Sequence, residues 1–201
     1  MDEGYVKYVA ERRDGIVPHS AQLDELNQAR TALFDLGLIG VYPDGVGYGN
    51  LSFRNSGNQF VITASATGAL RTLQSEQFCL VESFAVENNC VQSMGSLPAS
   101  SESMTHGAIY AAQPLVHWVM HVHSRVLFDD LLRRLAPSTS ADIPYGTPAM
   151  ARSVGALVAT QQQLPFVFVM AGHDEGVVAC GANMPSTLQA LLASLQRTSE
   201  T

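Results

Sequence analysis

Cysteine is scarce in this chain. Only three cysteines, Cys79, Cys90 and Cys180, occur in 201 residues, and they are widely spaced. An odd number of distant cysteines fits neither a disulfide framework nor a cysteine-rich zinc site. We therefore expect reduced and mostly buried thiols.

Positive charge is also scarce. The 18 acidic residues outnumber the 11 lysines and arginines, which gives a net charge of −7. Basic residues adjoin only at Arg12-Arg13 and Arg133-Arg134, so no basic surface for nucleic acid or an anionic membrane is expected. No apolar run approaches the ~18–20 residues of a membrane span, and Met1-Asp2-Glu3-Gly4 is acidic where a signal peptide would be basic. We expect a cytoplasmic protein whose partner is a small molecule.

Hydrophobic periodicity divides the chain into helices and strands. Residues 1–18 are polar and are interpreted as an N-terminal arm, and residues 19–201 as a single domain. Helical spacing predicts helices over Ser20–Leu38, Ser101–Ala112, Phe128–Leu135, Pro148–Gln162 and Pro185–Gln196. Strands are predicted over Leu51–Arg54, Gln59–Thr63, Phe78–Val81, Cys90–Gln92, Leu115–His123, Phe166–Met170 and Val177–Cys180. This succession predicts an α/β fold with three α/β/α layers around a mainly antiparallel sheet.

His121 and His123 form the strongest local signal for a site. On a strand their side chains point to the same side, and their Cα atoms lie roughly 6.6 Å apart. This spacing allows two imidazole nitrogens to converge on one ion at Zn–N distances of about 2.0–2.1 Å. Two ordinary strand histidines are the alternative. His117 shares their face but lies about 13 Å from His121, too far to bind the same ion.

A catalytic zinc takes three protein ligands and keeps one position open, so a third ligand is needed. His173 is the candidate, because it lies where a predicted strand runs into a glycine-lined turn. A turn histidine that bonds to its own backbone is the alternative. His106, one helical turn after Glu102, is more typical of a supporting or packing residue, and His19 in the polar arm is expected to be solvated.

Glu102 is positioned to act as a base beside this metal. It lies in the first turn of its predicted helix, where the helix dipole favours a carboxylate, so plain helix stabilisation is the alternative role. Ser100 and Ser101 precede it, and hydroxyls in front of helix N–H groups favour binding of a phosphate or carboxylate. The hydroxyl-rich turn Thr63–Gly68 is a second such place. Either could equally be an ordinary cap or turn.

Taken in order, these motifs resemble the class II aldolase and adducin family, which includes fuculose-phosphate and rhamnulose-phosphate aldolases and ribulose-phosphate epimerases. The resemblance covers about residues 22–193. It is carried by Gly49–Arg54, Ile62–Gly68, Ser100–Glu102, His106–Tyr110, His121–His123, Tyr145–Thr147 and His173 before Gly176–Gly181. Several motifs in the family's order are far more specific than any one of them.

The resemblance implies a role for each matching residue. His121, His123 and His173 would bind one Zn²⁺ or another divalent ion per chain, and Glu102 would be the catalytic acid/base. The pocket for a substrate phosphate would be formed by Asn50, Thr67, Gly68, Ser100 and Ser101. The implied reaction cleaves a carbon–carbon bond in a sugar phosphate, or a related hydroxylated carbonyl compound, through a metal-stabilised enediolate. The resemblance also implies a homo-oligomer, a tetramer.

The chain departs from the family pattern in three places. Asp174 and Glu175 separate His173 from the glycine that usually follows it directly, so Glu175 is an alternative third ligand. Residues 124–144 contain no counterpart of the tyrosine that serves as the acid in the sugar-phosphate aldolases. The turn before Gly68 is longer than usual and lacks its proline.

These departures leave other functions open on the same fold. An epimerase, a dehydratase and a decarboxylase are alternatives to an aldolase, and a non-catalytic, adducin-like binding module is the alternative to an enzyme. The intact Glu102, His121 and His123 favour an enzyme.

Overall fold

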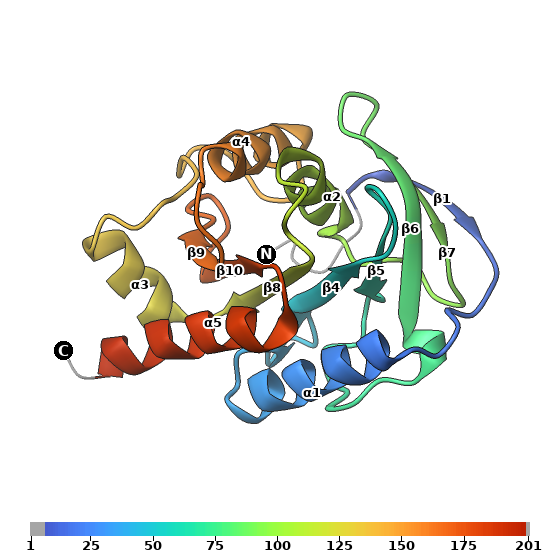
Figure 1. Ribbon diagram of the computed structural model, residues 1–201, viewed down its shortest axis with the longest axis horizontal. Coiled ribbons are helices and arrows are strands. Elements are labelled where there is room, and N and C mark those ends of the chain that lie inside the picture. The colour runs from blue at the N-terminus through green and yellow to red at the C-terminus, as the bar shows by residue number, and fades with distance from the viewer. Residues whose placement is uncertain (1–6, 200–201) are drawn as a thin grey trace.

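An eight-stranded sheet runs through the centre of the protein, in the order β1-β7-β6-β5-β4-β8-β10-β9 (Figure 1). The computed structural model describes residues 7–199. The strands are β1 (Val9–Arg13), β4 (Asn50–Arg54), β5 (Phe60–Thr63), β6 (Phe78–Ala85), β7 (Cys90–Met94), β8 (Trp118–His123), β9 (Phe166–Val169) and β10 (Gly176–Gly181). Neighbouring strands are antiparallel except β1 and β7, which are parallel. The predicted mainly antiparallel sheet is confirmed.

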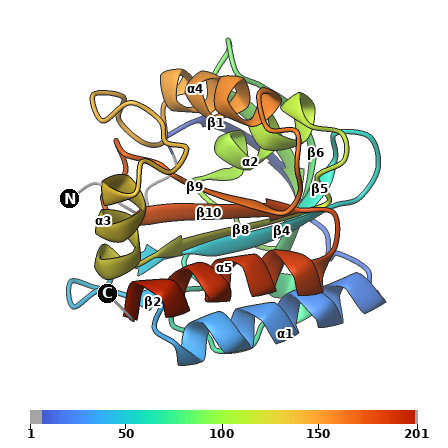
Figure 2. The same ribbon diagram turned by 60° about the vertical axis from the view of Figure 1, so that its left-hand side comes forward.

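Helices cover both faces of this sheet. They are α1 (Ala21–Asp35), α2 (Ser103–Ala112), α3 (Arg125–Arg133), α4 (Pro148–Ala159) and α5 (Met184–Ser199), with a short 3₁₀ turn at Ser75–Gln77. Figure 2 shows α2 and α4 on one face and α1 and α5 on the other. A separate two-stranded ribbon pairs β2 (Gly40–Val41) with β3 (Gly47–Tyr48). The predicted three-layer α/β/α arrangement is therefore confirmed.

Strand alternation sends neighbouring residues of β8 into two different cores. Val119 is buried with residues of α2 and α4, whereas Met120 and Val122 are buried with residues of α1 and α5. Each fully buried aliphatic side chain of this kind contributes about 1.5–3 kcal/mol to folding. His121 and His123 follow Val119 at intervals of two, so they point to the α2/α4 face. The apolar residues between them thus fix the face on which the histidines lie.

Two helices start two or more residues away from the predicted position. The helix expected from Phe128 begins at Arg125, because the Ser124 side chain accepts a hydrogen bond from the backbone N–H of Leu127 and caps it. The helix expected from Ser101 begins at Ser103, so Glu102 is its N-cap residue and does not lie in the first turn.

β1 lies in the polar segment 1–18, where the residue pattern predicts no strand. Its five residues are all exposed, so no alternation of buried and exposed positions marks it. It is a strand because it pairs with β7 at the edge of the sheet. The acidic Met1–Gly4 lies outside the described residues. Across residues 7–199, the helices are all too short or too polar to cross a membrane.

Candidate functional site

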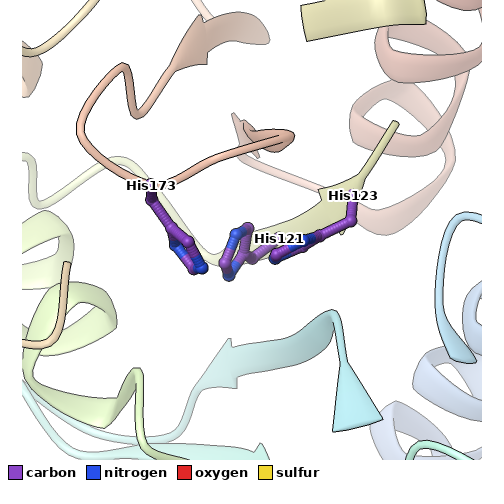
Figure 3. Close-up of side chains that lie close together, drawn as sticks. All are labelled: His121, His123 and His173. Carbon is purple, nitrogen blue, oxygen red and sulfur yellow. The ribbon is translucent and has the colours of Figure 1, made fainter. Parts of the chain in front are cut away.

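Two separate parts of the chain bring three histidines together (Figure 3). His121 and His123 come from β8, and His173 comes from the turn between β9 and β10. One ligand nitrogen from each lies within 4.8 Å of the others, and the ring centroids are 4.8–5.0 Å apart. All three side chains are buried, with at most 4% of their surface exposed. Small rotations of the rings would bring one nitrogen of each onto a single ion.

Gly176 allows this close approach. The turn before it is closed by its own backbone, because the N–H of His173 donates to the carbonyl of Met170 and the N–H of Gly176 donates to the carbonyl of His173, both at 2.8 Å. A Cβ atom at Gly176 would lie 2.9 Å from the His173 carbonyl oxygen, 3.2 Å from its ring and 3.3 Å from Nε2 of His121. A side chain at this position would therefore push the imidazoles apart.

The electrostatics of the cluster favour neutral imidazoles. Burial lowers the pKa of His121 well below its usual value, and the neighbouring His173, His123 and His106 lower that pKa further. The pKa of His123 is lowered in the same way, by burial and then by His173. At neutral pH both rings therefore keep a lone pair, which a metal ligand requires.

His121 shows that the cluster fits a metal. Both of its ring nitrogens are buried without a hydrogen-bond partner among the described residues. A buried polar group left unpaired costs about 1–3 kcal/mol, which an ion held by the ring would relieve. Three buried imidazoles are also a common ligand set for Zn²⁺.

Glu102 faces the same space as the histidines. Its side chain is only 3% exposed and makes no capping hydrogen bond to α2. Oε2 accepts a hydrogen bond of 2.8 Å from the Thr105 hydroxyl, whereas Oε1 has no partner among the described residues. Glu102, His121, His123 and His173 line one small cavity of about 20 Å³, large enough for a single ion or water.

A larger pocket of about 340 Å³ adjoins this cavity. All five residues predicted to bind the substrate phosphate line it: Asn50, Thr67, Gly68, Ser100 and Ser101. Asn50 and Ser101 also line the small cavity, so the two spaces lie next to each other. The volume falls within the range of small-molecule sites. Within residues 7–199 no lysine or arginine lines the pocket, so any anion there would be bound by hydroxyl, amide and backbone N–H groups.

Arg30 supports the pocket from inside the protein, and no local sequence pattern marks it. Its side chain is fully buried in α1, where Nη2 donates to the carbonyls of Thr67 and Leu70 at 2.7 Å and Nε donates to Leu70 at 3.1 Å. Burial lowers its pKa to about 10, so it stays charged at neutral pH. Gly68 completes the packing, because a Cβ there would lie 2.2 Å from the Gly40 carbonyl oxygen.

The remaining histidines lie away from the cluster or behind it. His19 is exposed, as expected, and His117 is exposed as well. His106 is buried, and burial lowers its pKa to about 3. Its Nδ1 lies 2.7 Å from the Ser52 hydroxyl, which also lies 2.7 Å from that of Tyr110.

Tyr42 and Glu175 form a hydrogen-bonded chain with His123 that the sequence did not predict. The Tyr42 hydroxyl lies 2.9 Å from Nδ1 of His123 and donates a hydrogen bond of 2.9 Å to Oε2 of Glu175. Glu175 is not part of the histidine cluster, because its carboxylate is turned towards Tyr42 and Arg125.

Comparisons with known proteins agree with this fold. The family profile of the class II aldolase and adducin N-terminal domain matches residues 43–198. Sequence comparison with curated proteins finds no match.

Among solved structures, YgbL from Klebsiella pneumoniae, described as a candidate aldolase, epimerase or decarboxylase, has a TM-score of 0.65 at 18% identity, over 91% of this chain and 89% of its own. An L-fuculose 1-phosphate aldolase has a TM-score of 0.64 at 16% identity, over 90% of this chain and 85% of its own. A sugar-phosphate aldolase from Thermotoga maritima has a TM-score of 0.63 at 16% identity, over 88% of this chain and 91% of its own. At these identities the likeness shows the fold alone.

Proposed function

Because the chain belongs to the class II aldolase and adducin family, we propose that it is a zinc-dependent lyase. Its reaction would cleave a carbon–carbon bond in a small hydroxylated carbonyl compound, such as a sugar phosphate. One observation carries this proposal: three buried histidines and the carboxyl group of Glu102 line one small cavity that adjoins a pocket of substrate size. A binding module without catalysis has no need of this arrangement.

His121, His123 and His173 would hold the metal, as Zn²⁺ or another divalent ion that accepts imidazole ligands. When bound, such an ion polarises a carbonyl and an adjacent hydroxyl and adds several kcal/mol of charge stabilisation in the transition state. Burial of the histidines keeps bulk water away from the reacting end of the substrate, which strengthens every charge interaction there.

Glu102 would move the proton. The Thr105 hydroxyl holds Oε2 and so fixes the carboxyl group, while Oε1 has no partner among the described residues and is available to a substrate hydroxyl or carbon-bound proton. A positioned acid/base of this kind contributes about 10²–10⁴-fold to the rate. Among the described residues, Glu102 is the one carboxyl group that lines the small cavity.

The other end of the substrate would lie in the larger pocket. Asn50, Thr67, Gly68, Ser100 and Ser101 would bind its phosphate through neutral donors, in the manner of backbone and hydroxyl anion sites. Because no basic side chain lines this pocket, a neutral hydroxylated end is the alternative to a phosphate.

An epimerase or a decarboxylase on the same site is the second candidate. Residues 124–144 contain no tyrosine, and that residue serves as the acid in the sugar-phosphate aldolases that the chain resembles. Among the described residues, the tyrosines that line the small cavity are Tyr48 and Tyr145. A reaction whose leaving group needs no proton, such as loss of carbon dioxide, would not require an acid at the missing position.

Metal analysis of the purified protein, combined with a substrate screen, tests the proposal. We expect about one metal ion per chain, lost in His121→Ala and kept in His117→Ala, an exposed histidine just before the same strand. The screen compares sugar phosphates with their dephosphorylated forms and with hydroxy acids. Less than about 0.1 ion per chain and no uptake of added zinc would refute the metal site. Absence of bound zinc together with absence of turnover would favour the adducin-like binding module, which keeps the fold without the metal.

A further inference from the structure

Tyr42 links the metal-site histidine His123 to the carboxylate of Glu175. The Tyr42 hydroxyl lies 2.9 Å from Nδ1 of His123 and 2.9 Å from Oε2 of Glu175. These residues come from three distant parts of the chain: the loop after β2, strand β8 and the turn before β10. The chain therefore contains an ordered path from a partly exposed carboxylate to a buried imidazole.

The chemistry of the two ends sets the direction of both hydrogen bonds. An ionised carboxylate only accepts, so the Tyr42 hydroxyl must donate its one proton to Glu175. The tyrosine oxygen is then left as the acceptor towards His123, and Nδ1 of His123 must carry the proton. A neutral imidazole with its proton on Nδ1 has its lone pair on Nε2, so Nε2 is the nitrogen left for a metal.

The Glu175 carboxylate is held in this place by its own turn. Its backbone has φ +64°, an uncommon value for a residue other than glycine, and such strain persists only where the surroundings impose it. Nε of Arg125 lies 3.5 Å from Oε1 of Glu175, and the same guanidinium also pairs with Asp174. Asp174 and Glu175 are the two residues that separate His173 from the glycine of the family motif.

The ring of His123 is also enclosed by aromatic side chains. Its centroid lies 5.6 Å from that of Tyr48 and 6.1 Å from that of Tyr42, and the two tyrosine rings are 4.5 Å apart. These contacts restrict rotation of the imidazole, while the hydrogen bond to Tyr42 selects which nitrogen faces away from the tyrosine.

We propose that Tyr42 and Glu175 are positioning residues, which hold His123 with its proton on Nδ1 and aim its Nε2 lone pair at the metal. Glu175 acts through Tyr42 and is not itself a ligand. This inference rests on the proposed function, because it concerns the same metal site. Supporting groups that accept the second ring N–H of a ligand histidine commonly contribute 10–100-fold to metal affinity.

Zinc affinity of a small set of variants tests this role. The dissociation constant is measured on metal-free protein by competition with a chromophoric chelator, for wild type, Tyr42→Phe, Glu175→Gln and the double variant. We expect each single variant to weaken binding about 10–100-fold. The double variant should match Tyr42→Phe within about twofold, because Glu175 has no path to His123 once the hydroxyl is gone.

Asp174→Asn is the matched control. It removes the neighbouring carboxylate that also pairs with Arg125, but leaves the hydrogen bond between Tyr42 and Glu175 in place. Its zinc affinity should stay within about twofold of wild type. A second readout needs no metal: long-range ¹H–¹⁵N spectra of histidine-labelled protein should show the His123 proton on Nδ1 in wild type and a mixture of tautomers in Tyr42→Phe.

The outcomes separate this inference from the proposed function. Zinc binding by wild type with unchanged affinity in both single variants would overturn the inference and leave the metal site intact. Additive losses in the double variant would overturn it as well. Loss of zinc in Glu175→Gln but not in Tyr42→Phe would make Glu175 a direct ligand. Absence of zinc binding in wild type would reject the proposed metal site and the inference together.

Discussion

Substitution of Glu102 by glutamine separates a catalytic role from a structural one. If Glu102 merely stabilised α2 through the helix dipole, its loss would cost roughly 0.3–1 kcal/mol of stability and little rate. The structure argues otherwise, because the side chain makes no capping hydrogen bond and one carboxyl oxygen is buried without a partner among the described residues. We therefore expect a large loss of turnover without a loss of stability.

The expected size of each effect follows from the contacts of Glu102. Glutamine keeps an oxygen that can accept the hydrogen bond from Thr105, but it cannot exchange the proton, so turnover should fall about 10²–10⁴-fold. Removal of an unpaired buried carboxyl oxygen relieves part of a cost of about 1–3 kcal/mol, although the new amide N–H₂ is also buried. We expect a gain between zero and about 1 kcal/mol, which corresponds to at most about 2–4 °C in melting temperature.

Turnover and melting temperature are measured on the same preparations, the latter after removal of metal so that ion binding does not contribute. Asp24→Asn is the control, because Asp24 is an exposed acidic residue in the first turn of α1; its effect reports the helix dipole together with the exposed contact between Asp24 and His19. A lowered melting temperature with unchanged turnover in Glu102→Gln would refute the catalytic role and restore the helix-stabilising one.

Other predictions concern the frame of the site. Gly176→Ala should weaken zinc binding and lower the stability by about 1–3 kcal/mol, because the new Cβ overpacks against His173. Gly155→Ala is the control: its new Cβ has no neighbour closer than 3.7 Å, so it should raise the melting temperature slightly. Equal changes of melting temperature in the two variants would contradict the argument. Arg30→Met should lower stability by about 1–3 kcal/mol, because the carbonyls of Thr67 and Leu70 lose the guanidinium that donates to them. The same loss should raise KM more than it lowers kcat, and an unchanged KM would contradict this. The protein should be a homotetramer, and a monomeric mass by light scattering at micromolar concentration would reject this.

Much of the fold is predictable because its signals are local. The apolar residues Leu23, Leu26, Ala29 and Leu33 of α1 recur with helical spacing and become buried, and Ser20 caps the helix as its type suggests. The β8 histidines are predictable for the same reason, since alternation along a strand requires only the sequence to place His121 and His123 on one face. His173, however, is 50 positions from His123, and the sequence linked it to the other two only through its place in a strand-end turn and through the resemblance to the family.

What could not be predicted depends on contacts between distant residues. β1 has no burial pattern of its own, because it is an exposed edge strand that exists through its pairing with β7. Tyr42 lies in a glycine-rich loop where tyrosine has no distinctive local role, and it is 133 positions from Glu175. The sequence pattern places Arg30 on an amphipathic helix as an ordinary polar residue, yet its side chain is fully buried and bonds to the loop that contains Thr67 and Leu70.

The distribution of unsatisfied polar atoms argues for function on physical grounds alone. Folded proteins pair nearly all buried polar groups, so each exception calls for a reason. Here the exceptions among the described residues include Oδ1 of Asn50, Oε1 of Glu102 and both ring nitrogens of His121, which line the same small cavity, whereas Nη1 of Arg30 and Nε2 of His106 lie outside it. A fold selected only for stability would fill such a place with apolar side chains, as it does on the opposite face of β8 with Met120 and Val122. Within β8, the unpaired buried atoms all belong to His121. A ligand that bonds to His121 and to the other unpaired atoms of the cavity best explains why the fold keeps polar groups there.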